Sequence, residues 1–197
     1  ISAATASGKT EAAFLPILSE MIPRQEKGLG ALYVGPLKAL INDQFRRLEE
    51  LCEAAEIPVF KWHGDVGGAQ KRRFLSEPSG VLLITPESIE SLFINHSSQL
   101  ASLFRSLPFI VIDEIHAFIG TERGMHLKSL LARITQISSI KPRIVGLSAT
   151  LGDLPSTQRW LSPRDPESVR IICDQGGEKD ISFLVKGYLF GTASDTE

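Results

Sequence analysis

The sequence is poor in cysteine, with only Cys52 and Cys173 among its 197 residues. Neither lies in a C-x-x-C pair or near histidines at metal-ligand spacing, which excludes a disulfide-stapled scaffold and a cysteine-based zinc site. We expect both to be buried thiols in a reducing cytosol. Long hydrophobic runs are also missing, since stretches such as Val81–Ile84 are too short to cross a bilayer. Nothing resembles a signal peptide, so the sequence predicts a cytoplasmic protein without a membrane partner.

A strong excess of either charge is absent as well, because the formal net charge is −2 and the pI is near 6.1. Domains that bind nucleic acid often carry a basic excess, so such a partner must be argued from placed motifs. The composition, 43% hydrophobic and 22% charged, is that of one ordinary globular domain with its own core. The chain starts at Ile1 rather than Met and ends in a polar stretch at residues 191–197, so we expect it to be part of a longer protein.

Continuous apolar runs rich in Val, Ile and Leu recur along the chain, and such runs predict strands buried on both faces of a sheet. The predicted strands are residues 31–34, 81–84, 109–112, 144–147 and 169–172. Between them lie stretches with helical spacing of apolar residues, such as residues 41–52 and 127–134. Alternation of strand and helix implies an α/β fold with a parallel sheet covered by helices on both sides.

Residues 3–10 (AATASGKT) match the phosphate-binding loop pattern G-x-x-x-x-G-K-[ST], with Ala3 in place of the first glycine. Backbone N–H groups of such a loop surround a phosphate, and the N-terminus of the following helix adds a favourable dipole. Lys9 would place a cation on the β and γ phosphates of ATP, and the Thr10 hydroxyl would ligate the Mg²⁺ that bridges them. A Gly-Lys-Thr tripeptide also arises by chance at helix starts, so further motifs must support it. The residues predicted to hold the nucleotide are Thr5, Ala6, Ser7, Gly8, Lys9 and Thr10.

Two adjacent acids, Asp113 and Glu114, directly follow the apolar run Phe109–Ile112. Burying two carboxylates without a cation is costly, and Mg²⁺ would remove that cost. We expect Asp113 to hold the ion, through water, and Glu114 to orient and deprotonate the attacking water. The predicted catalytic residues are therefore Lys9, Asp113 and Glu114.

Four polar clusters each follow an apolar run, at residues 35–38, 85–88, 113–116 and 148–150. Because parallel strands end at the same edge of a sheet, these clusters should lie along one edge. Ligands of open α/β sheets bind outside the carboxyl ends of the strands. We therefore expect both the nucleotide and a second partner at this edge.

With these motifs in this order, the sequence resembles the DEAD/DEAH-box superfamily 2 helicases from Ala3 to Thr150, a group in which alanine is usual at the first loop position. By that resemblance, residues 3–10 are motif I, 36–40 (PLKAL) motif Ia, 85–88 (TPES) motif Ib, 113–116 (DEIH) motif II and 148–150 (SAT) motif III. The resemblance implies a P-loop NTPase (RecA-like) three-layer sandwich. Residues 1–173 would form the first ATP-binding domain, with a truncated N-terminal strand, and residues 174–197 an exit strand and linker toward a second RecA-like domain.

The same resemblance implies contacts with a nucleic-acid strand, made to the sugar–phosphate backbone without reading sequence. His116, Ser148 and Thr150 would link the phosphate state of the nucleotide to the grip on the strand. Lys38 can also be explained as a solvated lysine at a helix start, and the basic residues 71–73 (KRR) as a solvated helix face. The residues implied for nucleic-acid contact are Pro36, Lys38, Thr85, Pro86 and Glu87.

The sequence therefore predicts the ATP-binding motor domain of an ATP-dependent helicase. PLKAL and the pair Arg123-Gly124 resemble the large helicase-related (Lhr) and superkiller-like branches, which favours DNA over RNA and leaves RNA open. A translocase or remodeller that does not unwind remains an alternative. A small-molecule kinase or transporter ATPase that shares only the loop is disfavoured by the later motifs, and a degenerate binding scaffold is disfavoured by the intact motif residues. The resemblance also implies a second motor domain that supplies arginines to the γ-phosphate, so this chain alone should bind nucleotide weakly and hydrolyse it slowly.

Overall fold

The computed structural model describes residues 1–4, 7–24, 28–149 and 153–174 of the chain. Within these residues five parallel strands form one sheet, in the order β2-β3-β1-β4-β5. Their bounds are β1 (Ala31–Val34), β2 (Val59–Trp62), β3 (Val81–Ile84), β4 (Phe109–Ile112) and β5 (Arg143–Gly146). The parallel sheet confirms the predicted α/β class.

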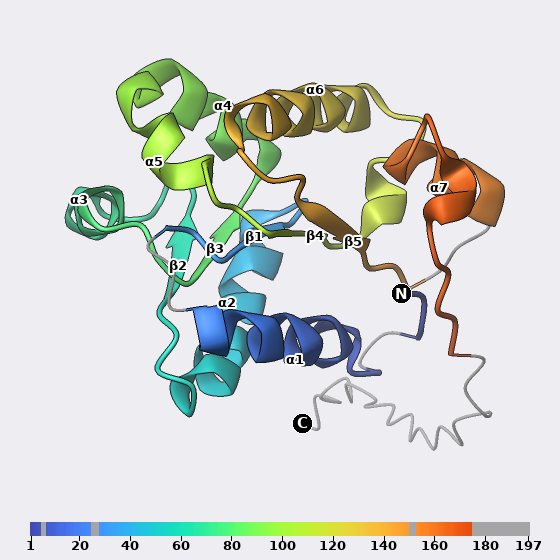
Figure 1. Ribbon diagram of the computed structural model, residues 1–197, viewed down its shortest axis with the longest axis horizontal. Coiled ribbons are helices and arrows are strands. Elements are labelled where there is room, and N and C mark those ends of the chain that lie inside the picture. The colour runs from blue at the N-terminus through green and yellow to red at the C-terminus, as the bar shows by residue number, and fades with distance from the viewer. Residues whose placement is uncertain (5–6, 25–27, 150–152, 175–197) are drawn as a thin grey trace, which may run out of the picture.

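The described α-helices are α1 (Lys9–Met21), α2 (Lys38–Glu53), α3 (Gly68–Ser76), α4 (Pro86–Asn95), α5 (Leu100–Phe104), α6 (Glu122–Ile137) and α7 (Leu154–Leu161). Short 3-10 turns lie at Ile22–Arg24, Ser97–Gln99, Ile115–Ala117 and Pro166–Ser168. Helices α4, α5 and α6 lie over one face of the sheet, and α1 and α2 lie over the other (Figure 1). The predicted three-layer sandwich is therefore confirmed.

The central strands β1, β3 and β4 bury every residue, which explains their continuous apolar runs. Successive side chains of a strand point to opposite faces of the sheet. In β1, Leu32 and Val34 belong to the core beneath α4, α5 and α6, whereas Ala31 and Tyr33 belong to the core beneath α1 and α2. Each face of the sheet thus has its own apolar core, and the strand ends are left to carry polar residues.

The structure differs from the predicted strands near the edges of the sheet. The apolar-run pattern misses β2, because this edge strand is half-buried and contains Lys61. The predicted strand at residues 169–172 is wrong, since pairing there is confined to one parallel bridge between Cys173 and Ser2, too short for a strand. The prediction that both cysteines are buried is wrong for one of them: Cys52 is buried in α2, but Cys173 is exposed on this short edge segment.

The chain enters the predicted phosphate loop beside β5. Ser2 forms parallel bridges to both Ser148 and Cys173, and the Ala3 amide donates a hydrogen bond to the Ser148 carbonyl at 3.2 Å. The predicted exit strand and linker at residues 174–197 lie, apart from Asp174, outside the described residues and stay a prediction. Every helix in the described part of the chain is too short or too polar to cross a membrane.

Candidate functional site

The predicted phosphate loop leads into α1 through Gly8, whose φ of 81° lies in the left-handed region that favours glycine. The Lys9 ammonium donates hydrogen bonds to the carbonyl oxygens of Ala3 and Ala4, both at 2.8 Å. The Ser7 hydroxyl is buried without a hydrogen-bond partner in the described part of the chain. A lysine, a hydroxyl and a helix N-terminus thus gather at one place, and together they suit an anion such as phosphate.

The first turn of α1 is held close to DEIH, motif II, by a series of contacts. Thr10 is 7% exposed, and its hydroxyl donates to Oε1 of Gln44 on α2 at 3.0 Å. One turn later, the Phe14 ring packs against Tyr33 with centroids 6.3 Å apart. The Tyr33 hydroxyl in turn donates a hydrogen bond to Oδ2 of Asp113. The start of α1 therefore lies over β1, next to the first acid of DEIH.

The two acids of DEIH differ in environment. Asp113 is 6% exposed, and its Oδ1 accepts a hydrogen bond from the Glu114 amide at 2.9 Å. Burial, followed by the negative charge of Asp113, raises the pKa of Tyr33 well above its ordinary value, so Tyr33 remains a hydrogen-bond donor. Glu114 has a φ of 46°, which is rare for a residue with a side chain. Backbone strain of this kind concentrates at functional sites.

His116 joins DEIH to the serine of SAT. Its Nδ1 lies 2.9 Å from the Ser148 hydroxyl and 3.3 Å from Oε2 of Glu114. Ser148 is fully buried, and its carbonyl accepts the hydrogen bond from Ala3 at the start of the phosphate loop. The structure therefore brings motifs I, II and III into one continuous set of contacts. The remaining predicted members, Thr5, Ala6 and Thr150, lie outside the described residues.

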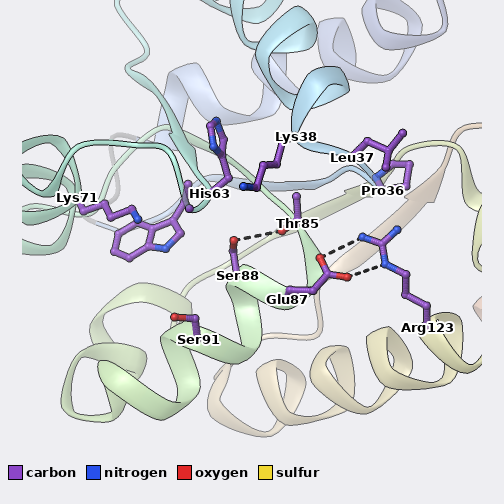
Figure 2. Close-up of a pocket in the computed structure, with 12 residues that line it drawn as sticks. Pro36, Leu37, Lys38, His63, Lys71, Thr85, Glu87, Ser88, Ser91 and Arg123 are labelled. Atoms are coloured by element: carbon purple, nitrogen blue, oxygen red, sulfur yellow. Dashed lines mark hydrogen bonds and ion pairs between the residues drawn. The ribbon is translucent and has the colours of Figure 1, made fainter.

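A pocket of about 520 Å³ lies at the carboxyl ends of β1, β2 and β3. Its wall includes the predicted strand-contact residues Pro36, Lys38, Thr85 and Glu87. Figure 2 shows Lys71, Lys38 and Arg123 across this pocket from left to right. Pro86 is the buried first residue of α4 and does not line the pocket. Motifs Ia and Ib therefore form one concave surface.

Two cations of the pocket are paired with carboxylates. Lys38 lies 3.2 Å from Oδ1 of Asp65, and Arg123 forms two hydrogen bonds to Glu87, at 2.6 and 3.0 Å (Figure 2). Burial alone would raise the pKa of the Glu87 carboxyl, but hydrogen bonds from Arg123 and its own backbone, with the Arg123 charge, hold that pKa below its usual range. The arginine that follows DEIH thus contacts the acid of TPES directly.

Comparison with known proteins identifies the family. Residues 1–157 match the family model described as DEAD/DEAH box helicase. The chain belongs to this family. It is 35% identical over 188 residues, 88% of its length, to the Lhr helicase/probable uracil glycosylase of Mycolicibacterium smegmatis. It is 33% identical over 177 residues, 82% of its length, to the ATP-dependent helicase Lhr-Core of Methanothermobacter thermautotrophicus. The chain spans 12% and 20% of the lengths of these two relatives.

Solved helicase structures give the same family and fold. The structure of Mycobacterium smegmatis helicase Lhr bound to ssDNA and AMP-PNP matches with a TM-score of 0.77 and 32% identity, over 90% of this chain and 24% of that one. The DUF1998 helicase MrfA bound to DNA and AMPPNP matches with a TM-score of 0.71 and 29% identity, over 82% of this chain and 23% of that one. The resemblance to Lhr-type DEAD/DEAH box helicases is therefore confirmed.

Several residues of this DEAD/DEAH box domain contact the motif residues without belonging to a motif. Tyr33 bonds to Asp113, Gln44 to Thr10 and Asp65 to Lys38. Each partner is more than 25 positions away along the chain, so no local spacing in the sequence reveals the pairs. Lys71 belongs to the basic residues 71–73, which the sequence alone does not distinguish from a solvated helix face. Only the fold shows that Lys71 lines the pocket.

Proposed function

We propose that this chain is the ATP-binding motor domain of an ATP-dependent nucleic-acid helicase, with DNA favoured over RNA. The observation that carries the proposal is a path of contacts from Lys9 through Ala3, Ser148 and His116 to Glu114. This path joins a phosphate-binding loop to the predicted general base. The ssDNA and AMP-PNP in the Lhr structure, and the DNA and AMPPNP in the MrfA structure, support both ligands.

The domain arrangement is part of the proposal. Residues 1–173 would be the first RecA-like domain, and residues 174–197 would lead to a second RecA-like domain that closes over the nucleotide. Closure of two domains on ATP and their reopening after hydrolysis would move the motor along a strand. This chain covers only 12% and 20% of the lengths of the two Lhr relatives, which is consistent with this division.

Magnesium fits the residues present. Thr10 and Asp113, residues that are 7% and 6% exposed, offer a hydroxyl and a carboxylate, and such hard oxygen ligands are those that Mg²⁺ prefers. Within the described residues, no group of three or more His, Cys, Asp or Glu side chains forms a complete metal site. Mg²⁺ does not require one, because phosphates and waters fill its remaining positions. When bound, the ion would neutralise the charge that develops on the transferred phosphoryl group.

Glu114 is the residue we propose as general base. Its side chain is 27% exposed, so a water can reach it, whereas Oε2 itself is buried 3.3 Å from Nδ1 of His116, without a hydrogen-bond partner among the described residues. Glu114 has a left-handed backbone conformation at the carboxyl end of β4, directly after the buried Asp113. The two acids can therefore take different roles, with Asp113 at the ion and Glu114 at the attacking water.

Binding of a fluorescent, non-hydrolysable ATP analogue in the presence of Mg²⁺ tests the nucleotide site. Lys9→Ala should weaken binding at least about tenfold, because it removes a charge that directly contacts phosphate. Lys128→Ala, a matched loss of a lysine on α6, should leave binding unchanged. Equal affinity of Lys9→Ala and the unsubstituted chain would overturn the assignment of the phosphate loop.

Single-turnover ATP hydrolysis tests the base. Glu114→Gln should bind the analogue with unchanged affinity and lower the hydrolysis rate by about 10²–10⁴-fold, the usual contribution of a general base. The slow hydrolysis expected of this chain makes a protein that also carries the second RecA-like domain the better sample. Normal turnover by Glu114→Gln there would exclude Glu114 as the base.

A further inference from the structure

We propose that Lys71, on α3, is a further contact for a phosphate of the bound nucleic-acid strand, at a position outside all the helicase motifs. The inference rests on the proposed function, since it extends the strand-binding pocket beyond motifs Ia and Ib. Lys71 lines the same pocket as Lys38 and Arg123 but enters it from the opposite side to Arg123 (Figure 2). A strand that crosses the pocket from Arg123 past Lys38 would therefore reach Lys71.

Lys71 differs from the other two cations of the pocket in its ion pairing. Lys38 is paired with Asp65 and Arg123 is paired with Glu87, so each must exchange or share a carboxylate when a phosphate arrives. For Lys71, no carboxylate lies within ion-pair distance among the described residues. An unpaired ammonium gives up less on binding a phosphate, because no existing ion pair has to be broken.

Lys71 is nevertheless held in place. Its ammonium lies 5.4 Å from the centroid of the Trp62 ring, at cation–π distance. Trp62 is only 4% exposed and is packed edge-on against Phe74, at 6.1 Å between centroids, and against His96, at 5.7 Å. The indole is thus a rigid support that orients the ammonium but leaves its full charge and its N–H donors to a ligand.

The neighbouring arginines do not share this position. Arg72 and Arg73 are exposed on α3, and neither lines the pocket. The basic residues 71–73 therefore split into one residue that faces the pocket and two that face solvent. Because a contact with the phosphate backbone carries no base information, Lys71 would add affinity for any sequence.

Fluorescence anisotropy with a labelled oligothymidylate tests the proposal on this chain. Lys71→Ala should weaken binding about fivefold at low salt, within the range for an accessible ion pair. The slope of log affinity against log salt should become shallower by about 0.7, the value for one lost contact to a single strand. Lys71→Arg should bind as the unsubstituted chain does, since it keeps the charge.

Lys128→Ala is the matched control, because the Lys128 ammonium also lies over an indole, that of Trp160 at 5.7 Å, but outside the pocket. This variant should leave both affinity and salt slope unchanged. Oligonucleotides with one neutral methylphosphonate at successive positions sharpen the test. At one of these positions, the neutral linkage should weaken binding to the unsubstituted chain. The same linkage should not weaken binding to Lys71→Ala any further, because the contact is already lost there.

Two results would overturn the inference and are distinguishable. If Lys38→Ala weakens strand binding while Lys71→Ala keeps the affinity and the salt slope, Lys71 lies off the strand path and the proposed function stands. If the unsubstituted chain binds the ATP analogue but no oligonucleotide, the strand-binding part of the proposed function fails together with the role of Lys71.

Discussion

Nδ1 of His116 lies between two oxygens: it forms a hydrogen bond with the Ser148 hydroxyl at 2.9 Å, and it lies 3.3 Å from Oε2 of Glu114 without a hydrogen bond to it. A single ring nitrogen carries at most one proton, so His116 cannot donate fully to both groups. A shift of Ser148 therefore changes how strongly His116 engages the proposed base. Ser148 is also bonded through its carbonyl to the start of the phosphate loop. With the roles proposed above, this arrangement would couple the nucleotide site to the rest of the protein.

The first prediction concerns that coupling. Ser148→Ala should leave affinity for the ATP analogue unchanged but reduce the stimulation of hydrolysis by a nucleic-acid strand about tenfold, the scale of one coupling free energy of 1–2 kcal/mol. The measurement is ATP hydrolysis with and without an oligonucleotide, in a protein that also carries the second RecA-like domain. Ser102→Ala, an exposed serine on α5, is the control. Undiminished stimulation in Ser148→Ala would contradict the coupling role.

The sequence predicts the centre of this fold better than its edges. Strands β1, β3 and β4 match their apolar runs residue for residue, because burial on both faces leaves a continuous pattern. The edge strand β2 contains Lys61 and has no such pattern. The bridge at Cys173 depends on a partner, Ser2, at the other end of the chain, which no local pattern can show.

The candidate site divides in the same way. The sequence singles out Lys9, Thr10, Asp113 and Glu114 because the proposed chemistry requires fixed residue types at fixed spacing from a strand or helix, and their roles stay predictions. Their supporting partners are not predictable, because the contacts are made between elements. The Tyr33 bond to Asp113, for example, spans 80 positions and exists only because β1 and β4 are neighbours in the sheet.

The second prediction concerns the acids that pair with the pocket cations. Asp65→Asn and Glu87→Gln should each tighten oligonucleotide binding about two- to fivefold at low salt, because each removes a negative charge that competes with phosphate. Both carboxylates are largely exposed, so folding should tolerate the changes. Glu53→Gln, at the opposite end of α2 from Lys38, is the control. Weaker strand binding by both variants would show that the carboxylates position the cations rather than compete with the strand.

The third prediction concerns the close packing of Gly124, which follows Arg123 in α6. A Cβ atom at Gly124 would lie 1.7 Å from the carbonyl oxygen of Phe118, so the backbone after DEIH must shift. Gly124→Ala should lower the free energy of unfolding by about 1–3 kcal/mol, as measured by urea denaturation. Gly67→Ala is the control, because a Cβ there meets no atom within 4 Å. Equal stability of the two variants would contradict the packing argument.

The last prediction separates the two thiols. Burial raises the pKa of Cys52 to about 11, whereas Cys173 is exposed at the edge of the sheet. Because the thiolate is the reactive form, a maleimide should label one thiol of the native protein at neutral pH and two in urea. Raising the pH to about 9 should not expose Cys52 to labelling, since that pH lies well below its pKa. Cys173→Ser should remain unlabelled until it unfolds, and rapid labelling of this variant in its native state would show that Cys52 is accessible.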